Sequence, residues 1–281
     1  MDRRVTQLIK KIRQRTGNYD SGSNITDDEI IDALNDAQER LQSIIMGAFN
    51  QELFRKTDTV SLVSEQYEYD LPVDIFNENF EMIEHTTNTT AGEFGYSRLD
   101  PIHPQEKNLV IGYYIRNGKI VSPYSSGTLR RFYIGKPVQI DKRRGIITSL
   151  APLTISGHDS DEELDSDDWI TIVDTLGEIK THSIFITGFN NGTGVISTTN
   201  ALTGASVDDY VVMGKKRSSH SEYKNNFERY LKAYVSVDLE IHDSNTDFQA
   251  DSAKMTKFEE EIADMSFGSQ SDIFDIAVTE C

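Results

Sequence analysis

The N-terminal part of the chain carries a helical pattern of hydrophobic positions. The spacing of apolar residues over 2–16 predicts a short amphipathic helix. Its apolar face should carry Val5, Leu8, Ile9 and Ile12. The stretch "NITDDEI" then places Thr26 at an N-cap and Glu29 three positions later, the pairing of a capping box. A second helix should follow, with an apolar stripe of Ile30, Leu34, Ala37, Leu41, Ile44, Ile45 and Ala48.

From residue 57 the hydrophobic pattern changes from helical to alternating. The stretch "TDTVSLVSEQYEYDLP" predicts two short strands around a Ser-Glu turn. In "YYIRNGKIVSP", Asn117-Gly118 supplies the positive φ angles of a type I′ turn, which predicts a hairpin between Tyr113–Arg116 and Lys119–Val121. A third strand is expected over 128–135. Residues 86–108 should be rich in loops, with one helical turn near "PQEKN".

Helical periodicity returns near the C-terminus. Ser219 and Glu222 are spaced as a second capping box. The helix that follows should bury an aromatic-rich stripe of Tyr223, Phe227, Tyr230, Leu231, Tyr234, Val237 and Ile241. Another helix is expected over 246–265. The last residues, "SFGSQSDIFDIAVTEC", alternate apolar and polar positions and should be mobile until they pair with another surface.

Residues 141–214 contain five short β-like runs joined by Gly, Asn and Asp turns, enough for a small barrel or sandwich. The expected fold is therefore α+β: an antiparallel helical bundle with β-hairpins, plus an inserted small all-β domain. Residues 1–140 and 215–265 should form a discontinuous helical and hairpin domain, and residues 266–281 a mobile C-terminal tail.

The composition limits the possible functions. The net charge of −18 argues against sequence-independent wrapping of duplex DNA, which requires Lys and Arg to neutralise phosphates. No apolar run approaches the roughly 18 residues of a membrane span, and the basic N-terminus lacks the apolar core of a signal peptide. Cys281 is the single cysteine, so no disulfide can form within the chain. Positive residues cluster near 3–15, 130–144 and 215–217, where solvated faces or contacts with an acidic neighbour, including another copy, would explain them.

The acidic stretch "GHDSDEELDSDDWITIVD" is the strongest candidate for a metal or catalytic site. Read as an EF-hand starting at Asp159, it would need Gly and Glu where Leu164 and Ile170 stand. Paired catalytic carboxylates need two differently tuned environments, whereas a run of carboxylates in one polar segment stays hydrated. We expect a solvated loop; weak binding of a divalent ion and catalysis are the alternatives.

No other pattern indicates an active site. The six histidines are scattered without metal-ligand spacing, and "GFNNGTG" lacks the strand, helix and Lys of a phosphate-binding loop. We therefore expect no catalytic residue, no metal site and no cofactor, and a protein that is not an enzyme.

The order of the elements resembles the head-to-tail connector, or adaptor, proteins of short-tailed bacteriophages, of the tail tubular or tail accessory factor type. The resemblance rests on the motif from Asp28 to Gln38 within "ITDDEIIDALNDAQERLQ", the strand end from Tyr69 to Pro72, and the strand pair from Ile120 to Leu129. It covers roughly residues 20–140 and the helix from 219.

The resemblance implies a structural protein of the virion head–tail junction, assembled in the bacterial host cytoplasm. Such proteins form a ring, usually twelve-fold, that binds the portal protein, extends the DNA channel without sequence-specific binding, and provides the platform for the tail nozzle or tube protein. The candidate portal and subunit contacts are Phe267, Ile273, Phe274, Ile276, Val278, Arg3, Arg4, Lys10, Lys11, Arg13, Arg130 and Arg131.

Two functions from other classes are the alternatives. One is a tail-associated hydrolase of the cell envelope, which would need a carboxylate or His in a cleft. The other is a receptor- or glycan-binding β module in 141–214 with Trp169 as its stacking platform; Trp169 alternates with Ile170 and Ile172, as core or edge packing would also require.

Overall fold

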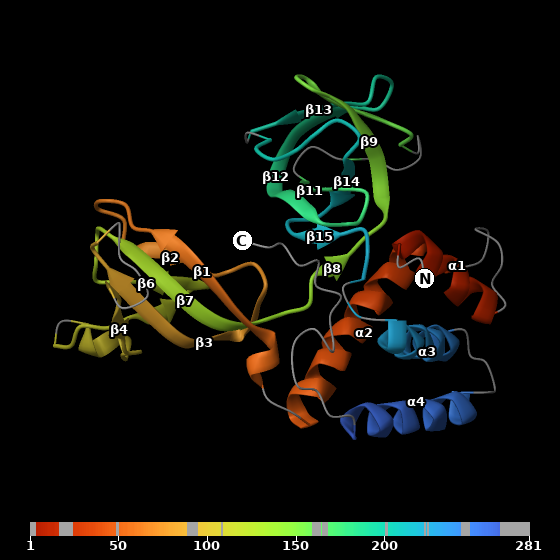
Figure 1. Cartoon of the computed structure of the whole chain (residues 1–281), viewed down its shortest axis with the longest axis horizontal. Helices are drawn as coiled ribbons and strands as arrows, with labels where there is room; N and C mark the ends of the chain where they lie inside the picture. The colour runs from red at the N-terminus through yellow and green to blue at the C-terminus, as the bar shows by residue number, and fades with distance from the viewer. Residues whose placement is uncertain are drawn as a thin grey trace. The chain divides into compact units, whose positions relative to one another are not determined.

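The computed structural model describes a mixed α+β protein (Figure 1). The residues described are 4–16, 25–48, 51–88, 95–107, 109–158, 164, 168–199, 202–221, 223, 225–242 and 248–264. The chain folds into two compact units, one made of residues 1–49 and 137–281 and the other of residues 50–136. No helix in these ranges is long and apolar enough to cross a membrane.

Helices from both ends of the chain pack together in the first unit. They are α1 (Val5–Thr16), α2 (Asp27–Ala48), α3 (Asn225–His242) and α4 (Phe248–Ala263). Helix α2 contacts the other three helices, and α3 also contacts α1 and α4. Most of the predicted apolar positions are buried here, including Leu8 and Ile12 of α1, Leu34 and Leu41 of α2, and Leu231 of α3. Ile44, Tyr234 and Val237 are half-buried, and the side chains of Ala48 and Ile241 lie outside the described part.

One of the two predicted capping boxes is confirmed. The Thr26 backbone N–H donates to Glu29 Oε2 at 2.6 Å, and the Glu29 N–H donates to Thr26 Oγ1 at 3.2 Å. The prediction of a second box at Ser219 is wrong, because α3 begins only at Asn225. The backbone before α3 has other partners: the Ser219 carbonyl accepts from the Val5 N–H, and His220 pairs with Arg4 as an isolated bridge.

A closed β-barrel occupies the middle of the chain (Figure 1). Its strands are β9 (Arg143–Leu150), β10 (Leu153–Ser156), β11 (Trp169–Val173), β12 (Ile179–Asn190), β13 (Val195–Thr198) and β14 (Tyr210–Met213). Neighbouring strands are antiparallel, in the order β10-β13-β12-β11-β14-β9. Branched side chains fill the interior, among them Ile147, Ile170, Ile172, Ile184 and Ile196.

Two short parallel strands connect the barrel with the helices. Strand β8 (Gln139–Ile140) pairs with β15 (Arg217–Ser218), so the chain enters and leaves the barrel side by side. The side chain of Asn35 on α2 holds this pair, because its amide donates to the Ile140 carbonyl at 3.1 Å and accepts from the Ile140 N–H at 2.8 Å.

The second unit contains two antiparallel sheets. One has the order β1-β7-β3-β4 and the other β2-β6-β5. The strands are β1 (Arg55–Ser61), β2 (Glu68–Asp70), β3 (Ile75–Thr86), β4 (Ser97–Leu99), β5 (Tyr114–Arg116), β6 (Lys119–Val121) and β7 (Thr128–Gly135), with 3-10 turns η1 (Gln51–Phe54) and η3 (Pro104–Glu106). Its small core contains Ile83, Leu99, Tyr113, Ile120 and Leu129.

The predicted hairpin is confirmed. Asn117 and Gly118 have φ of 52° and 68°, as a type I′ turn requires, and they join β5 to β6. Strand β3 was not predicted. Its pairing with β7 shifts between Ile75 and Met82, and Asn77 and Glu78 have positive φ, so its side chains do not alternate regularly.

Candidate functional site

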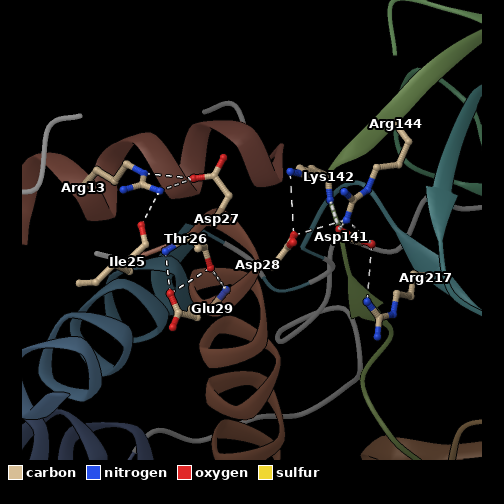
Figure 2. A network of polar contacts seen from close by, with 10 residues as sticks. All are labelled: Arg13, Ile25, Thr26, Asp27, Asp28, Glu29, Asp141, Lys142, Arg144 and Arg217. Atoms are coloured by element: carbon tan, nitrogen blue, oxygen red, sulfur yellow. Dashed lines mark hydrogen bonds and ion pairs between the residues drawn. The ribbon is translucent and has the colours of Figure 1, made fainter. Parts of the chain in front are cut away.

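The candidate contact residues begin on α1, which is positively charged. Lys11 Nζ contacts Glu228 Oε1 of α3 at 2.7 Å. Arg13 bonds to Asp27 Oδ1 at 2.6 Å and donates to the Ile25 carbonyl at 3.0 Å, which ties α1 to the start of α2 (Figure 2). These two cations therefore stabilise the packing of the helices within one chain.

The remaining α1 candidates lie toward solvent. Lys10 is exposed on the face opposite the buried stripe. Arg4 is also exposed, and its backbone forms the bridge with His220. Arg3 lies outside the described residues, as do Phe267, Ile273, Phe274, Ile276 and Val278.

Arg130 and Arg131 form ion pairs inside the second unit. Arg130 contacts Glu84 at 2.6 Å, and its guanidinium lies 4.1 Å from the ring centroid of Tyr96. Arg131 is buried, donates to Asp58 Oδ1 at 2.7 Å, and donates to the Asp70 carbonyl at 2.7 Å. Both arginines thus cross-link strands of one chain, and they lie in a different compact unit from the α1 candidates.

A polar network joins the start of α2 to the base of the barrel (Figure 2). Asp28, in the first turn of α2, lies 3.5 Å from Arg144 and 3.9 Å from Lys142. Arg144 also contacts Asp141 at 3.1 Å, and Arg217 approaches the same carboxylate at 3.6 Å. Two carboxylates therefore bind three cations from β9, β15 and the segment before β9.

Asp141 is the buried centre of this network. Burial raises the pKa of its carboxyl above the ordinary range, while Arg144, the Lys142 backbone N–H and Arg217 act in the opposite direction. Because an ionised buried carboxylate needs such partners, the arginines fix the position of Asp141 and of the β8–β9 connection. The run from Lys142 to Arg144 was recognised from the sequence, but the role of Asp141 was not, because the sequence shows neither its burial nor its contact with the distant Arg217.

Carboxylates also gather on the outer faces of α2 and α3. Asp36 is exposed, and the pKa of its carboxyl is raised by partial burial and by repulsion from Glu39, Asp238 and Asp32. These groups repel one another, so a cation placed against this face would be attracted to it.

The acidic stretch lies mostly outside the described residues. Leu164 is buried in the barrel core, and the Asp168 carbonyl accepts a hydrogen bond from the Ile186 N–H. Within the described ranges, no group of three or more His, Cys, Asp or Glu residues could hold a metal ion.

Trp169, the candidate stacking platform, is partly buried by its neighbours. Its ring meets Phe185 edge-on with centroids 5.1 Å apart, and Lys215 Nζ lies 4.7 Å from its centroid. The contacts are those of packing on the outside of the barrel.

The comparison with known families identifies the class of protein. A sequence model of the SU10 adaptor protein family matches residues 3–155, more than half of the chain. The match includes α1, α2, all of the second unit, β8 and β9, and it ends within β10. No curated protein matches the chain. Adaptors of this kind are structural components of the phage virion that have the portal and tail as partners in general. The chain therefore belongs to the SU10 adaptor protein family.

Proposed function

We propose that this adaptor forms a ring at the head–tail junction, where it binds the portal, extends the DNA channel and provides the docking platform for the tail. The observation that carries the proposal is the family match over residues 3–155. We further propose that the chain is an adaptor of a short-tailed bacteriophage, of the tail tubular or tail accessory factor kind, and that the ring has about twelve copies. Both proposals rest on the resemblance described in the sequence analysis.

The charge of the chain supports a passive channel. At −18, the chain carries a large excess of carboxylates, which repel the phosphates of DNA and let it pass without being held. No sequence-specific contact with DNA is needed for this role.

We propose that the chain consists of an adaptor domain and an inserted domain. Residues 1–140 and 215–265 form the adaptor domain, which includes the helices of the first compact unit and all of the second, and residues 141–214 are an insertion within it. In support, the barrel strands lie between Arg143 and Met213, and the chain enters and leaves through the paired strands β8 and β15.

We propose that contact between copies uses charge. Lys10, exposed on α1, would face the carboxylates of α2 and α3 on a neighbour, which include Asp32, Asp36 and Asp238. Lys11, Arg13, Arg130 and Arg131 already have carboxylate partners within the chain, so they would reach a neighbour only as members of those pairs.

The portal can be used to test the proposal directly. The purified adaptor is mixed with portal rings, and the complex is weighed by native mass spectrometry. We expect one discrete complex that carries many adaptor copies on each portal ring. Failure of the adaptor to bind, or binding of a single copy, would contradict the proposal.

A further inference from the structure

An exposed apolar loop stands out in the second unit. Leu109, Val110 and Ile111 are consecutive and expose 84%, 51% and 69% of their surfaces. Single exposed apolar residues are common, but three in a row form a contiguous patch that usually marks an interaction site.

The backbone around this loop is held in place. The N–H groups of Leu109 and Val110 donate to the Glu106 carbonyl at 2.8 and 3.1 Å, which continues the capped turn η3. On the other side, a Cβ on Gly112 would come within 2.4 Å of the Asp100 carbonyl oxygen, so only glycine permits this approach. The apolar tip is therefore preorganised, which lowers the entropy cost of binding.

The barrel carries an open groove with an uncharged lining. It lies where the β9–β10 turn meets β13, and its volume is about 460 Å³. Leu153 and Ile196 form a buried floor, and the walls include Leu150, Val195, Leu202 and Thr198. None of the lining side chains is charged.

We propose that the loop 109–111 of one copy inserts into this groove on the barrel of a second copy. The inference rests on the proposed function, because a ring requires one contact repeated between identical chains. Because copies with a charge of −18 repel one another, we expect an uncharged contact in addition to the contact of Lys10 with a neighbour's carboxylates, and both the loop and the groove are uncharged. A knob and a groove at different places on one chain form a heterologous contact, which closes into a ring when the rotation permits.

Site-directed disulfide trapping tests the contact with the full-length chain. Two single-cysteine variants are made in a Cys281→Ser background: Leu109→Cys, carrying an affinity tag, and Thr198→Cys, untagged. The two are mixed and oxidised mildly, and the heterodimer is quantified on a non-reducing gel. The matched control replaces Leu109→Cys by Leu176→Cys, because Leu176 is also a highly exposed leucine at 75%.

We expect the Leu109→Cys and Thr198→Cys pair to form heterodimer several-fold faster than the control pair. Adding Ile111→Asp to the tagged chain should lower the rate of heterodimer formation to that of the control pair. The melting temperature of the tagged chain should not change, because the loop is exposed. Equal rates for both pairs would overturn the inference.

The test separates this inference from the proposed function. If images of particles show rings in which the loop contacts the portal, the tail or a lipid surface, the proposed contact between loop and groove is wrong. The proposal of a ring-forming adaptor would still hold. A protein without rings would contradict both.

Discussion

At the scale of the residue, the side chain of Asn35 explains why α2 carries polar residues among its apolar ones. Asn35 forms two hydrogen bonds with Ile140 of β8, and Gln38 Nε2 donates to the Val138 carbonyl at 3.4 Å. Both residues are nearly inaccessible to solvent. They belong to the segment from Asp28 to Gln38 that suggested an adaptor, so that segment serves to attach the barrel connection to the helices.

Removing the Asn35 amide should destabilise the first unit. Asn35→Leu keeps much of the volume but leaves the Ile140 N–H and carbonyl buried without partners, which should cost about 1–3 kcal/mol for each unsatisfied group. Chemical denaturation followed by circular dichroism measures the loss. Gln14→Leu, at an exposed position of α1 in the same unit, is the control. An Asn35→Leu chain as stable as the parent would show that the two bonds contribute nothing.

Glu228 makes the packing of the helices dependent on pH. Its carboxylate lies between Lys11 and Lys232, with Nζ to Oε1 distances of 2.7 and 3.1 Å. Burial acts to raise the pKa of Glu228, but hydrogen bonds and attraction from the two lysines outweigh it and hold the pKa below the ordinary value of 4.5. A carboxyl with a lowered pKa stabilises the fold above its ordinary pKa, and that contribution is lost as the pH falls through the lowered value.

We therefore expect Glu228→Gln to lower the melting temperature at pH 7. The difference in melting temperature between the variant and the parent should shrink as the pH falls below the ordinary pKa of a glutamate. Melting curves between pH 7 and pH 3 measure it, with Glu260→Gln on the exposed face of α4 as the control. A difference that does not change with pH would mean that the lost charge is not its cause.

At the scale of the element, the helices and strands that depend on interactions between residues close in sequence were the predictable ones. The capping box of α2 and the Asn117-Gly118 hairpin depend on residues close in sequence, and both were predicted. The start of α3 was predicted wrongly, because β15 and the bridge from His220 to Arg4 engage the backbone before it. Strand β10 was not among the five predicted runs, because it follows β9 after only Ala151 and Pro152, without the Gly, Asn or Asp turn that separates the other runs.

The capping box should contribute measurably to α2. Thr26→Ala removes the oxygen that accepts from the Glu29 N–H, and such replacements cost about 1 kcal/mol. Urea denaturation measures the change in free energy of unfolding. Thr6→Ala, at an exposed position in α1, lacks an N-cap role and should be close to neutral. Equal effects of the two substitutions would contradict a capping role for Thr26.

The candidate site was less predictable than the fold, because its partners are far apart in sequence. Lys11 and Glu228 are separated by 217 residues, and Arg131 and Asp58 by 73. The clusters of positive charge were visible in the sequence, but their partners within the chain were not. The loop 109–111 lies between the region expected to be rich in loops, residues 86–108, and the predicted hairpin from Tyr113, so no prediction covered it, and its exposure follows from the fold of the second unit.

At the scale of the whole molecule, the C-terminal residues 266–281 carry a prediction about assembly. Residues 266–281, which lie outside the described residues, remain our choice for the segment that docks on the portal or a neighbouring copy. Phe274, Ile276 and Val278 alternate with Asp275, Ala277 and Thr279, so an extended segment would have one apolar face that could add to the edge of a sheet.

Deleting residues 268–281 should leave the circular dichroism and melting of the isolated chain nearly unchanged, and it should abolish assembly on the portal. Melting curves and co-sedimentation with portal rings measure the two effects. A truncated chain that unfolds would instead place the tail in the core of its own fold.

The central claim is that many copies of this chain close into a ring between head and tail. Electron cryomicroscopy of assembled particles, reconstructed at the head–tail junction, tests it most directly. We predict a closed ring of this chain, about twelve copies, around a continuous channel beneath the portal. A single copy of the chain at the junction, or its absence from the ring of density below the portal, would contradict the account.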